Sequence, residues 1–280
     1  MDTGITITEK LQVFSDWLSK EEKSAGTIEK YLRDTGAFAA WLGERELTRE
    51  TASAWKEHLL SMQYAPTTVN SMLASVNTYC AFAGLNIRIR FLKVQKKMFR
   101  EPERELTRTE YDRLIETALT SGKERLALLM ETICASGIRV SEVKYITVEA
   151  AQYGRATINL KGKVRSILLP GKLCRKLIKY AKKQKIASGE IFLTGSGKSL
   201  SRRQIWAEMK RLCKKAGVEE SKVFPHNLRH LFASTFYRIY KDIVRLADVL
   251  GHSSVDTTRI YLVTTGEEHM RQLEKMGLVS

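Results

Sequence analysis

The sequence predicts a mainly α-helical protein with a small β-sheet, divided into two domains. Its 280 residues exceed the usual size of one domain, and 43% hydrophobic residues are enough to build ordinary cores. Apolar side chains recur at helical spacing along most of the chain, whereas residues 157–169 are typical of two strands joined by a tight basic turn.

The positive charge is concentrated in one part of the chain. Residues 1–95 hold 11 basic and 11 acidic side chains, which cancel. Residues 96–280 hold the other 36 basic and 20 acidic side chains, and with them the whole net charge of +16. This one-sided excess favours a polyanion as the partner of the second part, and a merely solvated basic surface is the alternative.

The composition argues against several classes of protein. No apolar run approaches the roughly 20 residues of a membrane span, and the N-terminus lacks a signal-peptide pattern. The four cysteines lie far apart and form no CxxC pair, at Cys80, Cys134, Cys174 and Cys213. They are typical of buried thiols in a reducing cytoplasm, not of a zinc site or a disulfide framework.

Residues 1–95 are predicted to form an all-α domain. Apolar stripes and end signals give four helices, at 11–18, Ser24–Gly43, Thr48–Leu59 and Pro66–Gly84. Residues 96–105 follow as a linker, because Lys96, Lys97 and Arg100 accompany a proline and no apolar period. These three cations are expected to lie on an acidic partner.

Residues 106–280 are predicted to form a second domain, with helices around one hairpin. The elements expected are helices from Thr107 and Lys123, strands 157–160 and 164–169, a basic helix 172–185, a short strand 191–193 and a helix from Ser201. Gly162 supplies the turn geometry of the hairpin.

A polar cluster at 225–230 provides the first candidate chemistry. His226, Arg229 and His230 fall on one face of a helix, because three- and four-residue spacings bring side chains together. Two imidazoles and a guanidinium are unfavourable neighbours without an anion to receive them. The spacing of the two histidines also suits zinc, but Asn227 stands where the metalloprotease pattern has a glutamate, so no metal is expected.

A second cluster begins at His252. Tyr261 follows it by nine residues, in a segment that Ser253 or Ser254 is able to cap. Tyrosine is a candidate nucleophile, and phosphate is the anion that arginines and histidines hold best. The two clusters together predict a phosphodiester site.

Four motifs, taken in order, resemble the tyrosine recombinase family in its phage-integrase and Xer branch. They are Arg139 in Ser-Gly-Ile-Arg-Val-Ser-Glu, the Lys161 turn, His226-x-x-Arg229, and His252 with Tyr261. The first domain resembles the family's core-binding domain through Ser24, Thr27 and Tyr31. The resemblance covers nearly the whole chain, and it implies a helical, SAM-like core-binding domain followed by a catalytic domain.

The resemblance implies a role for each residue of the set. Breaking a DNA phosphodiester requires stabilised charge on the non-bridging oxygens, a nucleophile and a proton for the leaving oxygen. Arg139 and Arg229 would clamp the phosphate, and His226 and His252 would complete the donors and help move the tyrosyl proton. Tyr261 would attack phosphorus and form a 3′-phosphotyrosyl link, which conserves the bond energy so that no ATP and no metal is needed.

The proton for the leaving 5′ oxygen is assigned to the hairpin turn. Lys161 resembles the family's general acid, and Lys163 is the alternative because the family turn is often one residue longer. Glu142 resembles the acidic residue that orients the site, and His230 is interpreted as a packing or supporting residue. Contacts with DNA are expected from Lys96, Lys97, Arg100, Lys163, Arg165, Arg202 and Arg203.

The resemblance therefore implies a cytoplasmic site-specific recombinase that grips duplex DNA and needs no cofactor. It implies a tetramer on two DNA sites, as a homo-oligomer or with a related recombinase. Two alternatives remain open, a type IB topoisomerase-like enzyme and a non-catalytic DNA-binding regulator on the same fold. Residues 266–280 are predicted to form a short amphipathic helix that docks on a neighbouring protomer, with docking on its own domain as the alternative.

Overall fold

The computed structural model describes residues 7–94, 104–160, 163–252, 254–261, 270–271 and 274–277. The chain divides into two compact units, Met1–Lys96 and Lys97–Ser280. Both are mainly helical, and the sheet found in the described ranges has two strands, so the predicted fold class is confirmed. Within these ranges no helix is long and apolar enough to cross a membrane.

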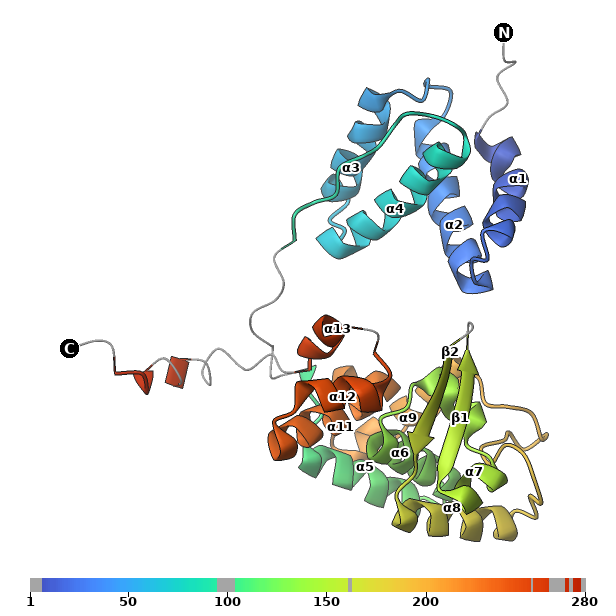
Figure 1. The fold of residues 1–280 in the computed structure, drawn as a ribbon, viewed down its shortest axis with the longest axis vertical. Coiled ribbons are helices and arrows are strands. Elements are labelled where there is room, and N and C mark those ends of the chain that lie inside the picture. The colour runs from blue at the N-terminus through green and yellow to red at the C-terminus, as the bar shows by residue number, and fades with distance from the viewer. Residues whose placement is uncertain are drawn as a thin grey trace. The chain divides into compact units, whose positions relative to one another are not determined.

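Over residues 7–94 the first unit has four helices (Figure 1): α1 Ile7–Lys20, α2 Ala25–Leu42, α3 Arg49–Ser61 and α4 Pro66–Phe82. Local signals set their starts. Thr48 and Thr51 exchange hydrogen bonds between side chain and backbone N–H at the start of α3. Pro66 occupies the first turn of α4, where its missing N–H leaves no bond unmade.

An extended segment after α4 is held by two asparagines. Asn77 accepts a hydrogen bond from the Ile89 N–H at 2.8 Å and donates one to the Ile89 carbonyl at 3.0 Å. Asn70 does the same with Leu92, at 2.7 and 2.9 Å. Each amide thus satisfies both backbone groups of its partner, as a neighbouring strand would. The segment follows α4 as far as Leu92.

The second unit is organised around α6 (Glu124–Ser136), whose side chains Leu126, Leu129, Met130 and Ile133 are buried. The other helices are α5 Arg108–Thr120, α7 Val148–Tyr153, α8 Gly171–Lys183, α9 Arg202–Lys210, α10 Cys213–Ala216, α11 Pro225–Tyr240, α12 Ile243–Leu250 and α13 Val255–Arg259, with the 3-10 helices η2 Val140–Tyr145 and η3 Glu220–Lys222. Helices α5, α8, α9 and α11 all pack against α6 (Figure 1).

Strands β1 (Arg155–Leu160) and β2 (Lys163–Leu168) form an antiparallel hairpin next to α7 (Figure 1). In its register Ile158 lies opposite Arg165. Ile158 and Ile167 are buried, whereas Val164 and Leu168 are exposed, as expected for a hairpin with one covered face. Residues 161 and 162, at the turn, lie outside the described residues.

The predicted strand at 191–193 is wrong. The side chains of Ile191 and Phe192 are buried in the core, but this stretch forms no strand. Two isolated bridges occur here, Leu193 with Ser199 inside the stretch and Glu190 with Thr147 directly before it. An apolar run of three residues marks burial, and it does not distinguish a strand from a buried connection.

Candidate active site

Arg139 and Glu142 are joined by a salt bridge and a backbone hydrogen bond at the start of η2. The Glu142 carboxylate, which is 2% exposed, accepts from the Arg139 backbone N–H at 2.7 Å and from its guanidinium at 3.0 Å. The Arg139 side chain is 42% exposed. The carboxylate therefore fixes both the backbone and the side chain of Arg139, and the guanidinium remains accessible to a ligand.

Arg229, on α11, is the buried arginine of the site. Its guanidinium donates to the carbonyls of Gly137 and Leu250, the latter at 2.9 Å. It also donates to Nε2 of His252 at 2.9 Å. Burial lowers the pKa of Arg229, and a hydrogen bond with the Tyr261 side chain opposes this effect. Three acceptors from two chain segments, Gly137 and Leu250 to His252, thus orient one cation.

His252 is held between Arg229 and Thr258. Arginine only donates, so Nε2 of His252 accepts, and Nδ1 carries the proton toward Oγ1 of Thr258 at 2.8 Å. Burial, followed by the charges of Arg229 and Arg139, lowers the pKa of His252 to about 4. The structure therefore favours a neutral imidazole.

Three imidazoles surround Tyr261. Its ring centroid lies 6.1 Å from that of His226, 5.0 Å from that of His230 and 5.9 Å from that of His252. The His252 ring stacks on it at 11°, and the His230 ring meets it edge-on. Tyr261 is 4% exposed and packs in an apolar cluster of α11 and α12. The two sequence clusters meet at this tyrosine.

His226, whose ring lies near that of Tyr261, is exposed at the surface. Burial, then Arg229 and Arg139, lower the pKa of His226, although part of its side chain is exposed. It also lines a hollow of about 410 Å³ together with Arg202, Arg203 and Trp206. Both of these arginines are exposed, and so is Trp206 at 48%. Two predicted DNA contacts therefore lie beside a predicted catalytic residue.

Two family models match the chain. The phage integrase family matches residues 104–268, and the phage integrase N-terminal SAM-like domain matches residues 11–85. The chain belongs to the phage integrase family. The tyrosine recombinase recognised in the sequence is thereby confirmed, and the enzyme is a tyrosine-type site-specific recombinase. The topoisomerase-like and regulatory alternatives are not favoured.

Relatives of similar length match over nearly the whole chain. Tyrosine recombinase XerA of Thermococcus kodakarensis is 29% identical over 278 residues, covering 97% of this chain and 96% of that protein. Tyrosine recombinase XerC of Roseiflexus castenholzii is 29% identical over 280 residues, covering 91% and 88%.

Solved structures share the fold. A lambda integrase tetramer bound to a Holliday junction has a TM-score of 0.73 and 18% identity, covering 93% of this chain and 78% of that one. XerH recombinase in a post-cleavage complex with palindromic difH has a TM-score of 0.72 and 18% identity, covering 97% and 84%. The arrangement of elements is thus common to these proteins at low sequence identity.

The remaining predicted cations are placed differently from one another. Arg165 is turned inward, where its guanidinium donates to Glu142 at 2.7 Å and to the Leu250 carbonyl. Lys163 is the first residue of β2. The other four, Lys96, Lys97, Arg100 and Lys161, lie outside the described residues.

The sequence analysis missed several groups of this site. Thr258 fixes the tautomer of His252, and the carbonyls of Gly137 and Leu250 orient Arg229. Thr258 lies six residues after His252, close enough to have been considered as its partner. The carbonyls carry no signal, because every residue has one.

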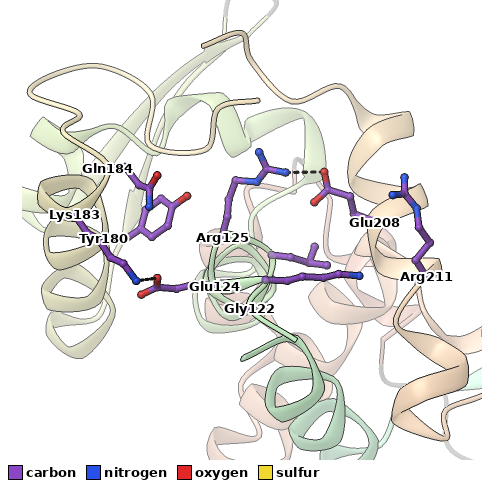
Figure 2. Close-up of a pocket in the computed structure, with 10 residues that line it drawn as sticks. Gly122, Glu124, Arg125, Tyr180, Lys183, Gln184, Glu208 and Arg211 are labelled. Atoms are coloured by element: carbon purple, nitrogen blue, oxygen red, sulfur yellow. Dashed lines mark hydrogen bonds and ion pairs between the residues drawn. The ribbon is translucent and has the colours of Figure 1, made fainter. Parts of the chain in front are cut away.

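A second hollow, of about 490 Å³, lies where α6 begins and α8 and α9 end. Figure 2 shows Arg125 reaching Glu208 and Lys183 reaching Glu124, at 2.7 and 2.5 Å. None of the predicted site residues lines it. Elsewhere in the described ranges no group of three or more His, Cys, Asp and Glu is placed to hold a metal ion.

Proposed function

We propose that this recombinase cuts and rejoins duplex DNA at specific sites through a 3′-phosphotyrosyl link to Tyr261, with neither metal nor ATP. One observation carries the proposal. The ring of Tyr261 lies within 5.0–6.1 Å of three imidazole rings and beside the buried Arg229. A tyrosine side chain with arginine and histidine neighbours suits attack on a phosphate.

In the first step, Oη of Tyr261 loses its proton and attacks the scissile phosphorus. An Oη–P bond forms as the P–O5′ bond breaks, so no external energy source is required. Arg139 and Arg229 hold the two non-bridging oxygens as forked donors. His226, kept neutral by its lowered pKa, is suited to accept the tyrosyl proton.

The leaving 5′ oxygen takes its proton from the hairpin turn. We assign this step to Lys161, with Lys163 as the alternative, because Lys163 begins β2 and Lys161 lies two residues before it in the sequence. The 5′-hydroxyl of a partner strand then attacks the phosphotyrosyl link and restores the phosphodiester. The carboxylate of Glu142 supports Arg139 during both steps, and His230 packs against Tyr261.

The proposed assembly is a tetramer on two duplex sites, alone or with a related recombinase. Residues 1–95 would bind the DNA as the core-binding domain, and residues 106–280 would bind it as the catalytic domain. Residues 96–105 would link the two. Two facts support it: the excess positive charge of residues 96–280, and the fold shared with a lambda integrase that was solved as a tetramer on a Holliday junction. A cytoplasmic location is part of the proposal.

Replacing Tyr261 with phenylalanine tests the nucleophile. Tyr261→Phe should retain DNA binding and lose cleavage, because only the attacking oxygen is removed. Covalent protein trapped on a nicked suicide substrate is the measurement. Adducts formed by the variant would show that another residue attacks, and Tyr237 and Tyr240 would be tested next. Relaxation of supercoiled plasmid by wild-type protein without strand exchange would favour the topoisomerase-like alternative.

Sulfur substitution tests the general acid. Lys161→Ala should cleave a normal phosphate at least about 100-fold more slowly, and a 5′-bridging phosphorothiolate should restore the rate because its sulfur leaves without a proton. Lys163→Ala is the matched control. Rescue of Lys163→Ala but not of Lys161→Ala would move the acid by two residues.

A further inference from the structure

Arg165 lies in the middle of β2 and is directed into the second unit. Its side chain is 18% exposed, and it shares the covered face of the hairpin with Ile167. The guanidinium donates to Oε2 of Glu142 at 2.7 Å and to the carbonyl of Leu250. Nε is buried without a hydrogen-bond partner. A surface contact with DNA does not require such a placement.

The two acceptors of Arg165 are the acceptors of the phosphate-binding arginines. Glu142 also accepts from Arg139, and the Leu250 carbonyl also accepts from Arg229. Arg165 is therefore connected, through these shared acceptors, to both arginines that we assign to the phosphate. If its guanidinium moved, the Glu142 carboxylate would transmit the change to Arg139, and the Leu250 carbonyl would transmit it to Arg229.

A glycine makes this placement possible. A Cβ at Gly251 would lie 2.5 Å from Cδ of Arg165, a distance that real Cβ atoms essentially never show, and 3.0 Å from Cζ, so the Arg165 side chain would have to shift. The φ of Gly251 is also +62°, in the left-handed region. The backbone immediately before His252 thus leaves a space that the Arg165 side chain fills.

The charges show what holds the guanidinium there. Burial and the positive charge of Arg139 lower the pKa of Arg165, and Glu142 opposes both. Three arginines and one carboxylate meet in this region, so a third cation adds repulsion to a site that already binds an anion. Its two hydrogen bonds compensate only while the hairpin stays against η2 and the end of α12.

We propose that Arg165 is a positioning residue: it locks the β1–β2 hairpin, and with it the lysine that protonates the leaving oxygen, to the carboxylate of Glu142 and the carbonyl of Leu250. The hairpin and the phosphate-binding arginines then move as one unit. This inference rests on the proposed function, and it holds whether Lys161 or Lys163 is the acid, because both lie within four residues of Arg165 in the sequence.

The test compares Arg165→Met with wild type on two suicide substrates, at saturating DNA. Methionine keeps an unbranched side chain and removes both hydrogen bonds. On a normal phosphate we expect covalent complex to form about 100-fold more slowly, as for loss of general-acid catalysis. On a 5′-bridging phosphorothiolate the rate should return to within about tenfold of wild type, because no proton is needed. Arg165→Lys should be intermediate, since one ammonium replaces a fork of donors.

A matched control and three contrary outcomes complete the experiment. Arg155→Met makes the same change at an exposed position of β1, and its two rates should stay near wild type. Equal loss on both substrates would overturn the positioning role, and weaker DNA affinity with an unchanged rate would make Arg165 a direct DNA contact. If Arg165→Met fails to fold, the test uses Arg165→Lys instead, by the ratio of its rates on the phosphorothiolate and on the normal phosphate. Absence of covalent complex with wild-type protein would instead contradict the proposed function.

Discussion

At the scale of single residues, the hydrogen bond from Arg229 sets the protonation of the neighbouring His252. Arg229 occupies Nε2 of His252 as a donor, so the ring proton lies on Nδ1, toward Thr258. A protonated His252 would direct an N–H at the guanidinium. The free site therefore presents a neutral imidazole amid positive charge, and a bound phosphate changes that balance.

We predict that His252 remains neutral in the free protein down to about pH 4, the pKa to which burial and Arg229 lower it from 6.5. Between these pH values the unfolded chain binds a proton that the folded chain does not. The contribution of His252 to the free energy of unfolding therefore falls as the pH falls from 6.5 toward 4.

An NMR titration of the imidazole nitrogens measures this pKa, with His252→Gln to assign the signal. Bound DNA should raise the pKa, because a phosphate anion stabilises the imidazolium. A titration midpoint near the ordinary value of 6.5 in the free protein would contradict the prediction.

The motif residues were accessible from the sequence, whereas the connections between them were not. Arg139, Arg229 and Tyr261 belong to short patterns of fixed spacing. Arg165 was interpreted as a DNA contact, because a lysine- and arginine-rich hairpin gives no other indication. Its acceptor carbonyl lies 85 residues further along the chain, and a carbonyl has no residue type by which a pattern could find it.

At the scale of elements, local signals were reliable and short apolar runs were not. The helix starts predicted at Thr107 and Ser201 are confirmed, and each forms a capping box with the residue three positions later, Glu110 or Gln204. The signal for such a start is therefore local in the sequence. The run at 191–193 depends on what surrounds it in space, which explains the wrong strand. The asparagine contacts to the segment after α4 were missed for the same reason.

We predict that Asn77→Ala releases this segment from α4. Both backbone groups of Ile89 lose their partner, which should lower the free energy of unfolding by about 1–3 kcal/mol in urea titrations of the full chain. Hydrogen exchange at the Ile89 amide should accelerate at the same time. Asn86→Ala, at an exposed position of the same segment, is the control. Unchanged exchange at Ile89 would show that packing alone holds the segment.

At the scale of the whole molecule, the two units differ in net charge. The first is neutral over residues 1–95, and the second carries the excess that attracts DNA. Among the described residues, the groups around Tyr261 and its arginines come from η2, α11, α12, α13 and β2, all of the second unit. The groups to which we assign the chemistry thus all belong to one unit.

The tail after Tyr261 is predicted to connect those copies. Of residues 266–280 only 270–271 and 274–277 are described, and within them Met270 and Met276 are 57% and 58% exposed. Apolar side chains exposed in one chain favour burial against another. Deleting residues 267–280 should preserve single-site DNA affinity and weaken the two-site complex on native gels. Equal two-site complexes from truncated and full-length protein would show that the tail packs on its own domain.

The close contact between Gly251 and Arg165 also limits which substitutions the chain accepts at these two positions. A lineage that gains a side chain at position 251 has to shorten or move the one at position 165, because the two cannot occupy the same volume. The change at 165 would in turn leave Glu142 and the Leu250 carbonyl with one donor fewer each. A single substitution at position 251 therefore also disturbs the hydrogen bonds made by the side chain at position 165.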